Sequence, residues 1–166
     1  TKLLRGNLQT RLGKLDKGDY DGIILAVAGL ERLGLESRIT QILPVAQFIP
    51  SIGQGALAVE ICAKRSDLKE LLVPLHDETS AARVGAEREM GRFLKASCNL
   101  PIAGFAEFSA DQELKLTALI ADSGEGIYLH SQVSGKIENY IQLGRECAEQ
   151  LLAQGAAGIV AKFAKQ

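Results

Sequence analysis

The sequence predicts a mixed fold, in which an α/β part is followed by a smaller α+β domain. Near the N-terminus, a helical pattern, a continuous apolar run and a second helical pattern follow one another with short connections, which is typical of an α/β layer. After Pro101 the pattern changes to three strand-like runs and an amphipathic helix. We therefore expect residues 76–166 to form a separate domain, a three-stranded antiparallel sheet covered by helices on one face.

The N-terminal part begins with leucines at helical spacing, which predict a helix over residues 7–18. Residues 23–27 are continuously apolar, as in a strand that is buried on both faces of a parallel sheet. Gly29 is expected to end this strand, and residues 30–39 begin a second helix.

The middle of the chain contains short elements between breakers. Residues 45–49 are expected to be extended between two prolines, and residues 56–62 form a second strand. Helices are predicted over residues 67–75 and 78–94, the second capped by Asp77 or Thr79. The predicted buried face of the second helix consists of Ala82, Ala86, Met90, Phe93 and Leu94.

The C-terminal part has strand-like runs over residues 102–108, 113–120 and 126–133, separated by turn-rich segments. An amphipathic helix is predicted over residues 137–152, followed by a short helix over 155–165. The predicted apolar stripe of the longer helix consists of Ile137, Tyr140, Ile141, Gly144, Cys147, Ala148 and Leu151.

Composition narrows the possible functions. Hydrophobic residues make up 46% of the 166 positions, which allows a real core, and no apolar run is long enough to predict a membrane span. Residues 1–40 hold seven Lys and Arg against five Asp and Glu, but aromatic residues are only 5% and Trp is absent. A nucleic-acid partner is therefore not expected, and an anionic small molecule fits the local basic excess better.

The three cysteines form no recognisable disulfide or metal pattern, because their number is odd and both histidines are distant in sequence. We expect no metal site, and a reducing compartment, the cytoplasm. Cys147 lies on an apolar stripe and is predicted to be a core thiol. Cys62 lies in a predicted strand and is predicted to be a core or structural thiol. Cys98 lies in a loop beside small residues, and its position alone leaves both an incidental and a reactive thiol open.

The stretch EREMGRFLKASCNLPIA, residues 87–103, resembles the cofactor-attachment signature of the porphobilinogen deaminase (hydroxymethylbilane synthase) family. Glu-Arg, the spaced apolar positions, the cysteine and the following proline match, whereas Ala96 and Leu100 stand where the family usually has Gly and Ile, Val or Thr. The stretches LLRGNLQTRLGKLDKGDYDGIILAVAGLERLGL and IPSIGQGALAVEI also resemble that family. The resemblance implies that this chain is the C-terminal part of a longer, three-domain enzyme.

The resemblance also implies a domain organisation. Residues 1–49 would be the last part of domain 2, residues 51–73 would return to domain 1, and residues 76–166 would form domain 3. Domains 1 and 2 of the family resemble periplasmic binding proteins, with the active site in the cleft between them. The complete protein is expected to be a monomer.

The family reaction joins four porphobilinogen molecules into hydroxymethylbilane and releases ammonia at each addition. The resemblance implies a dipyrromethane cofactor held by a thioether to Cys98. A thiolate suits this attachment, because it is a strong soft nucleophile toward the electrophilic methylene that loss of ammonia creates. The growing polypyrrole chain would then stay anchored while units are added at its other end.

The same resemblance implies that Arg5, Arg11 and Arg32 bind carboxylates of the cofactor and substrate. Guanidinium groups suit this role, because they stay charged and bind carboxylates through paired hydrogen bonds. Gly29 and Gln54 match cofactor-contacting positions. The family's catalytic aspartate lies in its N-terminal half, which is expected to be the partner of this chain. No catalytic residue is identified here, because Asp16, Asp19 and Asp21 occupy no matching motif.

Two hypotheses of other classes stay open: a non-catalytic anion-binding module related to periplasmic binding proteins, and a redox or sensor protein that uses Cys98. The attachment signature together with RGNLQTR favours the transferase. A binding module needs only RGNLQTR, and a redox sensor needs neither motif. Under all three hypotheses, we expect no membrane partner.

Overall fold

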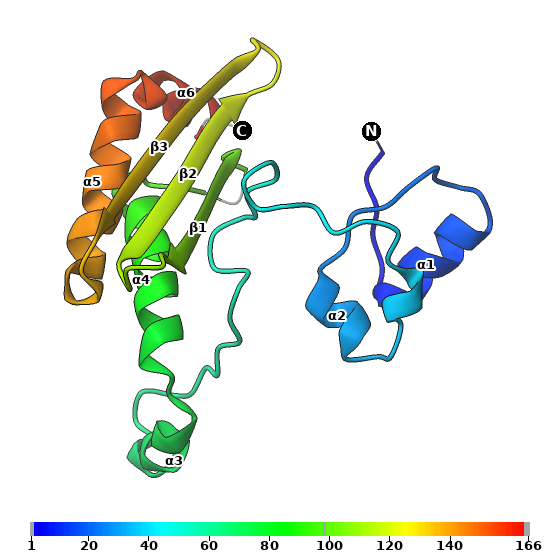
Figure 1. Cartoon of the computed structure of the whole chain (residues 1–166), viewed down its shortest axis with the longest axis horizontal. Coiled ribbons are helices and arrows are strands. Elements are labelled where there is room, and N and C mark those ends of the chain that lie inside the picture. Colours follow the sequence, from blue (N-terminus) through cyan, green and yellow to red (C-terminus); the bar gives the residue numbers. More distant parts are fainter. Residues whose placement is uncertain (1, 98, 165–166) are drawn as a thin grey trace. The chain divides into compact units, whose positions relative to one another are not determined.

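The computed structural model describes residues 2–97 and 99–164, and the chain divides into two compact units, Thr1–Pro44 and Val45–Gln166 (Figure 1). Each unit is described by itself. The predicted domain boundaries at residues 49–51 and 73–76 stay predictions. No helix in the described part of the chain has both the length and the apolar character needed to cross a bilayer.

The first unit begins with α1, Leu8–Asp16, which confirms the predicted helix. The side chain of Asn7 caps α1, because its Oδ1 accepts hydrogen bonds from the Thr10 amide and hydroxyl, each at 2.8 Å. Leu12 is buried on the inner face of α1, where the leucine spacing places it.

The predicted strand at residues 23–27 is wrong. The chain is irregular up to Ala26 and then forms α2, Val27–Glu31, followed by the 3-10 turn η1, Glu36–Arg38. Gly29 therefore lies inside a helix and does not end a strand. An apolar run becomes a parallel strand only beside neighbouring strands, and the described residues offer it no such neighbour.

The second unit begins irregularly, and two further predictions fail there. Residues 45–47 form a turn rather than an extended segment, and residues 56–62 are not a strand. Leu57 is 79% exposed, and Cys62 is exposed rather than buried in a sheet. The physical reason is the same, since no strand of the described chain pairs with these residues.

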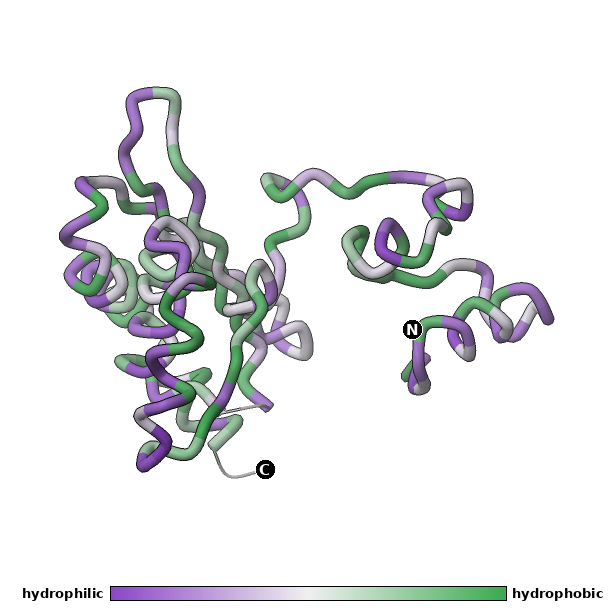
Figure 2. The backbone as a smooth tube through the Cα atoms, turned by 90° about the horizontal axis from the view of Figure 1, so that it is seen from below, coloured by the Kyte–Doolittle hydropathy of each residue, from purple (hydrophilic) through white to green (hydrophobic). Residues whose placement is uncertain are grey.

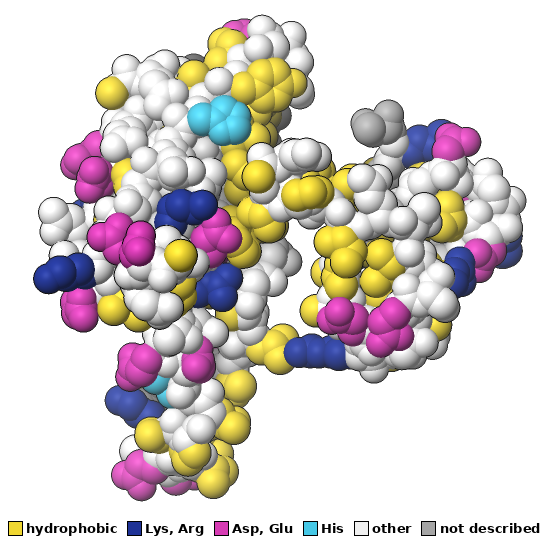
Figure 3. Space-filling model, viewed as in Figure 1, with side chains coloured by type: hydrophobic (Ala, Val, Ile, Leu, Met, Phe, Trp, Pro, Cys, Tyr) yellow, Lys and Arg dark blue, Asp and Glu magenta, His cyan; other side chains and the backbone are white. Residues whose placement is uncertain are grey.

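The next elements are α3, Ser66–Leu72, the 3-10 turn η2, Val73–Leu75, and α4, Glu78–Phe93, which confirm both predicted helices. Asp77 is the N-cap of α4, because its Oδ1 accepts a hydrogen bond from the Ser80 amide at 2.7 Å. Hydrophobic side chains gather on the surface around α3 (Figure 3). The exposed apolar residues of α3 and η2 are Leu71, Val73 and Leu75.

The sheet is the predicted meander of β1, Ile102–Phe108, β2, Leu114–Asp122, and β3, Ile127–Gly135. The order is β1-β2-β3 and both pairs are antiparallel, so β1 and β3 are the edges. Ala106, Leu116 and Val133 stand opposite one another across the three strands, and all three are buried. Along β2, buried and partly buried positions alternate, so one face of the strand lies against the core. In Figure 2, hydrophobic and hydrophilic segments are spread along the whole backbone.

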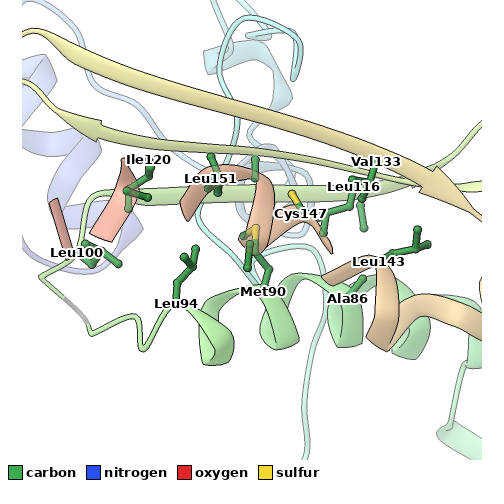
Figure 4. Packing of buried hydrophobic residues seen from close by; sticks show 14 of the residues in the cluster. Ala86, Met90, Leu94, Leu100, Leu116, Ile120, Val133, Leu143, Cys147 and Leu151 are labelled. Atoms are coloured by element: carbon green, nitrogen blue, oxygen red, sulfur yellow. The ribbon is translucent and has the colours of Figure 1, made fainter. Parts of the chain in front are cut away.

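Helices cover one face of this sheet, as predicted (Figure 1). After the 3-10 turn η3, Ile137–Asn139, the chain forms α5, Tyr140–Ala153, and α6, Ala156–Phe163. Figure 4 shows Met90 and Leu94 of α4 facing Cys147 and Leu151 of α5 beneath the sheet. Phe93 and Ile141 were predicted on the buried faces of their helices, but they are 36% and 38% exposed, so these two predictions are wrong. Both residues lie near an end of their helix.

Candidate functional site

The turn before α1 gathers several cationic side chains. The Nε of Arg11 donates a hydrogen bond to the Gly6 carbonyl at 2.7 Å, and the Nζ of Lys14 donates to the Arg5 carbonyl at 3.1 Å. Gly6 has φ of +125°, and a Cβ there would lie 2.8 Å from Thr10 Cγ2, so the turn requires glycine. The structure therefore brings Arg5 and Arg11 to one turn.

The guanidinium groups of this unit differ in their partners. Arg38 forms an ion pair with Asp16 at 2.5 Å. Arg5, Arg11 and Arg32 form no ion pair with any carboxylate of the described residues. Guanidinium groups without ion pairs can bind a ligand that carries acetate and propionate groups, so these residues fit the dipyrromethane that the sequence predicts.

Arg32 and Gly29 lie together at α2, Gly29 within the helix and Arg32 at its C-cap. Arg32 is exposed. A Cβ added to Gly29 would meet no described heavy atom within 4 Å, so the space beside this backbone is open. The predicted strand end is absent, but an open approach to the Gly29 backbone is present.

Gln54 belongs to the other unit, where it lies exposed in the turn Ile52–Gly55. The amide of Gly53 donates a hydrogen bond to Glu87 Oε2 at 2.7 Å, which fixes this turn to α4. A small depression beside the turn is lined by Gly55, Ser80, Arg83, Val84 and Glu87. Gln54 therefore lies next to Gly53, which is bonded to α4, and belongs to a different unit from Arg5, Arg11 and Arg32.

Glu87 and Glu89 are buried carboxylates of α4 with opposite surroundings. Burial raises the pKa of Glu87, although the amides of Gly53 and Ala106 donate to it. Glu89 accepts two hydrogen bonds from Arg92 and one from Arg145, and these lower its pKa to about 2. Glu89 therefore holds α5 to α4 as a charged group, whereas Glu87 binds backbone amides only.

Cys98 lies outside the described residues. The chain before it leaves α4 through Lys95, whose φ is +53°, and the Ala96 amide donates to the Gly91 carbonyl at 2.8 Å. Of the two cysteines that the structure describes, Cys147 is fully buried, as predicted, and burial raises the pKa of its thiol to about 11. No cluster of metal-binding side chains occurs among the residues that the structure describes.

Comparison with known proteins identifies the family. Residues 1–70 match the family model "Porphobilinogen deaminase, dipyromethane cofactor binding domain", and residues 81–153 match "Porphobilinogen deaminase, C-terminal domain". The chain belongs to the porphobilinogen deaminase family. Matches to the family thus cover both the unit with the arginines and the domain with the attachment signature.

Several curated relatives named porphobilinogen deaminase are similar to this chain. The protein of Laribacter hongkongensis is 47% identical over 159 residues, which are 96% of this chain and 51% of that protein. The protein of Paraburkholderia phymatum is 50% identical over 162 residues, 96% of this chain and 49% of that protein. The protein of Bordetella parapertussis is 46% identical over 162 residues, 98% and 51% of the two chains. The chain spans about half the length of the porphobilinogen deaminases it matches.

From the sequence, Glu87 was identified only as part of the porphobilinogen deaminase signature. That its carboxylate is buried and binds the Gly53 amide was not predicted. Two signals were available. Glu87 directly follows Ala86, a residue of the predicted buried face of the helix. A carboxylate beside such a face is rarely buried without a hydrogen-bond or ion-pair partner. Gly91 interrupts the same helix, and an isolated glycine within a helix often marks a close approach of another segment. Ile52 makes that approach, since a Cβ on Gly91 would lie 2.6 Å from Ile52 Cδ1.

Proposed function

We propose that this chain is the cofactor-carrying part of a hydroxymethylbilane synthase. The complete enzyme would join four porphobilinogen molecules into hydroxymethylbilane and release four molecules of ammonia. The observation that carries this proposal is the match of residues 1–70 to the cofactor-binding domain, in a chain that also holds the attachment signature. The complete enzyme would be a cytoplasmic monomer and would include the half of the family that this chain does not span.

Each site residue has a proposed task. The Sγ of Cys98 would hold the dipyrromethane through a thioether, and the bound group supplies the fixed end to which pyrrole units are added. Arg5, Arg11 and Arg32 would neutralise its carboxylates, because their guanidinium groups are free of ion pairs with described residues. The exposed Gln54 and the open backbone of Gly29 would contact the same ligand.

The proposed architecture follows the family. Residues 1–49 would complete one periplasmic-binding-protein-like domain, and residues 51–73 would return to another. Residues 76–166 would be domain 3. Exposed apolar side chains in the first two segments support this organisation, because Ile24 is 62% and Leu57 79% exposed and each would be covered by neighbouring strands.

The test uses a hybrid protein, in which this chain replaces the matching part of the Laribacter hongkongensis relative. The intact mass of the hybrid purified from cells is expected to exceed that of the polypeptide by one dipyrromethane. Peptide mapping is expected to place the added mass on Cys98, and Cys98→Ser should abolish the normal attachment. Cys62→Ser is the matched control, because Cys62 is a cysteine outside the signature.

Two outcomes would contradict the proposal. An unmodified mass together with no consumption of porphobilinogen would favour the anion-binding module. An unchanged adduct and full activity in Cys98→Ser would remove Cys98 from the role.

A further inference from the structure

The free edge of β1 is covered in an unusual way. Because β1 is an edge strand, its outward backbone groups need partners other than a strand. The Gly104 amide donates to the Pro50 carbonyl at 3.0 Å, and the Ala106 amide donates to Glu87 Oε1 at 2.9 Å. The Ala106 carbonyl accepts from Arg83 Nε at 2.6 Å. Side chains of α4 and the segment at Pro50 thus take the place of a fourth strand.

Glu87 uses its second oxygen for a different segment. Oε2 accepts from the Gly53 amide at 2.7 Å, so one carboxylate joins the edge of β1 to the turn Ile52–Gly55. The residue is only 4% exposed. A carboxylate is rarely buried to this extent, because burial penalises its charge, and here two amide donors offset that penalty. The buried carboxylate of Glu87 therefore fixes the turn Ile52–Gly55 to the edge of β1.

A second contact fixes the same turn independently. Ile52 packs into a notch over two glycines, since a Cβ on Gly91 or Gly104 would lie 2.6 Å or 2.9 Å from its side chain. The notch exists only because α4 and β1 both carry glycine at this place. Residues 50–53 are therefore held by backbone, carboxylate and apolar contacts, whereas Gln54, the next residue, is exposed.

We propose that Glu87 is a positioning residue, which together with Ile52 fixes Gln54 to the α4–β1 body of the C-terminal domain. The inference rests on the proposed function, in which Gln54 contacts the bound ligand. α4 also leads into the stretch that contains Cys98, which lies outside the described residues.

The experiment has a structural arm in the 166-residue chain and a kinetic arm in the hybrid. In Glu87→Gln, an NH2 donor replaces one of the two carboxylate oxygens, so it faces the amide of either Gly53 or Ala106 and one of the two hydrogen bonds is lost. Hydrogen exchange of a peptide spanning residues 50–55 is expected to accelerate at least tenfold. In Glu89→Gln, the matched control, exchange of this peptide should not change, because Glu89 is equally buried in α4 but binds only arginines.

The kinetic arm is a double-mutant cycle on porphobilinogen consumption. Gln54→Ala and Glu87→Gln are each expected to lower the rate about tenfold, as for one lost hydrogen bond to a charged group. If Glu87 acts through Gln54, the double variant should be no slower than either single variant. Ile52→Ala, which loosens the turn without changing Glu87, should show the same lack of additivity. Glu89→Gln combined with Gln54→Ala should multiply the separate effects.

Each result decides a separate point. Unchanged exchange of residues 50–55 in Glu87→Gln would overturn the inference at any level of activity. Multiplied rate effects in the Glu87→Gln and Gln54→Ala double variant would also overturn it, as would a Gln54→Ala variant of normal rate. A third outcome is a hybrid that carries no cofactor and is inactive, with accelerated exchange in Glu87→Gln. It would show that the proposed function fails although Glu87 holds the turn Ile52–Gly55.

Discussion

Residues 2–75 and residues 76–164 differ sharply in how many of their apolar side chains are buried. In the first region only Leu12 and Leu30 are buried hydrophobic residues, and many large ones are exposed, Leu57 by 79%. In the second region one cluster joins the sheet to α4, α5 and α6, and the most exposed large hydrophobic residue is Tyr128, at 60%. The first region holds apolar runs without the elements that cover them, whereas the second region holds both.

The largest expected effect tests this difference directly. In the 166-residue chain, amides of residues 76–164 should be protected from hydrogen exchange, whereas those of residues 2–73, apart from the turn at residues 50–55 that Glu87 holds, should be protected more weakly. The chain alone should not consume porphobilinogen, because the proposed catalytic groups lie in the other half. In the hybrid, protection of residues 2–73 should rise.

Exchange mass spectrometry beside a porphobilinogen assay measures both expectations. Equal protection of the two regions in the chain alone would contradict the comparison. Turnover by the chain alone would contradict the placement of catalytic groups outside it.

A matched pair of leucine substitutions sharpens the comparison. Leu151 is fully buried in the cluster, so Leu151→Ala is expected to lower the free energy of unfolding by about 2–5 kcal/mol. Leu57→Ala in the same chain should change it by less than about 0.5 kcal/mol, because this side chain is already exposed. Urea denaturation measures both.

The hybrid provides the second half of this test. If the other half of the protein covers residues 57–62, Leu57→Ala should become clearly destabilising there. A Leu57→Ala variant without effect in the hybrid would show that these apolar side chains are not covered.

The regions were predictable from sequence to different extents, for the same physical reason. The elements of residues 76–164 were predicted nearly completely, because the alternation along β2 and the stripe of α5 find their partners within the region. The strands expected at residues 23–27 and 56–62 failed, because strand pairing requires a neighbour that the described chain does not supply. The hydrophobic pattern showed that these two runs would be buried by neighbouring strands, but not which part of the protein supplies those strands.

The candidate site was predictable only in part. The arginines of RGNLQTR were found by resemblance, and the structure adds that Arg5 and Arg11 share one turn. The link between Gly53, next to Gln54, and Glu87 was not predictable, because it joins positions 34 residues apart through a backbone amide and a side chain. Neither propensity nor periodicity carries information about such a contact.

The arginines should separate function from stability within the first region. Arg11→Leu or Arg32→Leu should change stability by no more than about 0.5 kcal/mol, as for an exposed charge. In the hybrid, each should cost about 1.5–3 kcal/mol of ligand binding, which is roughly tenfold or more in cofactor assembly or elongation. Arg38→Leu is the control, because its guanidinium is already paired with Asp16. Normal elongation by both variants would show that Arg11 and Arg32 are ordinary surface charges.

The second region should carry its own acid sensitivity. The pKa of Glu89 lies near 2, well below the ordinary value of about 4.3, because Arg92 and Arg145 bind its charged form. Its stabilising contribution is therefore full above pH of about 5 and is lost as the pH falls toward 2. The melting temperature of Glu89→Gln should depend less steeply on pH over this interval than that of the unchanged chain. Parallel curves would contradict this role, and the exposed Glu138→Gln is the control.

The smallest expected effect lies where the second region leads toward Cys98. Lys95 has φ of +53°, a left-handed conformation that costs an L-residue about 1–2 kcal/mol and costs glycine little. Glycine also gains freedom in the unfolded chain, which offsets about 0.5–1 kcal/mol, so Lys95→Gly should stabilise the region by about 0.5 kcal/mol. Lys95→Ala is the control, because alanine keeps the strained conformation and removes only the exposed side chain. Equal urea midpoints for the two variants would show that this turn holds no strain, and that the approach to the attachment loop is as relaxed as the core behind it.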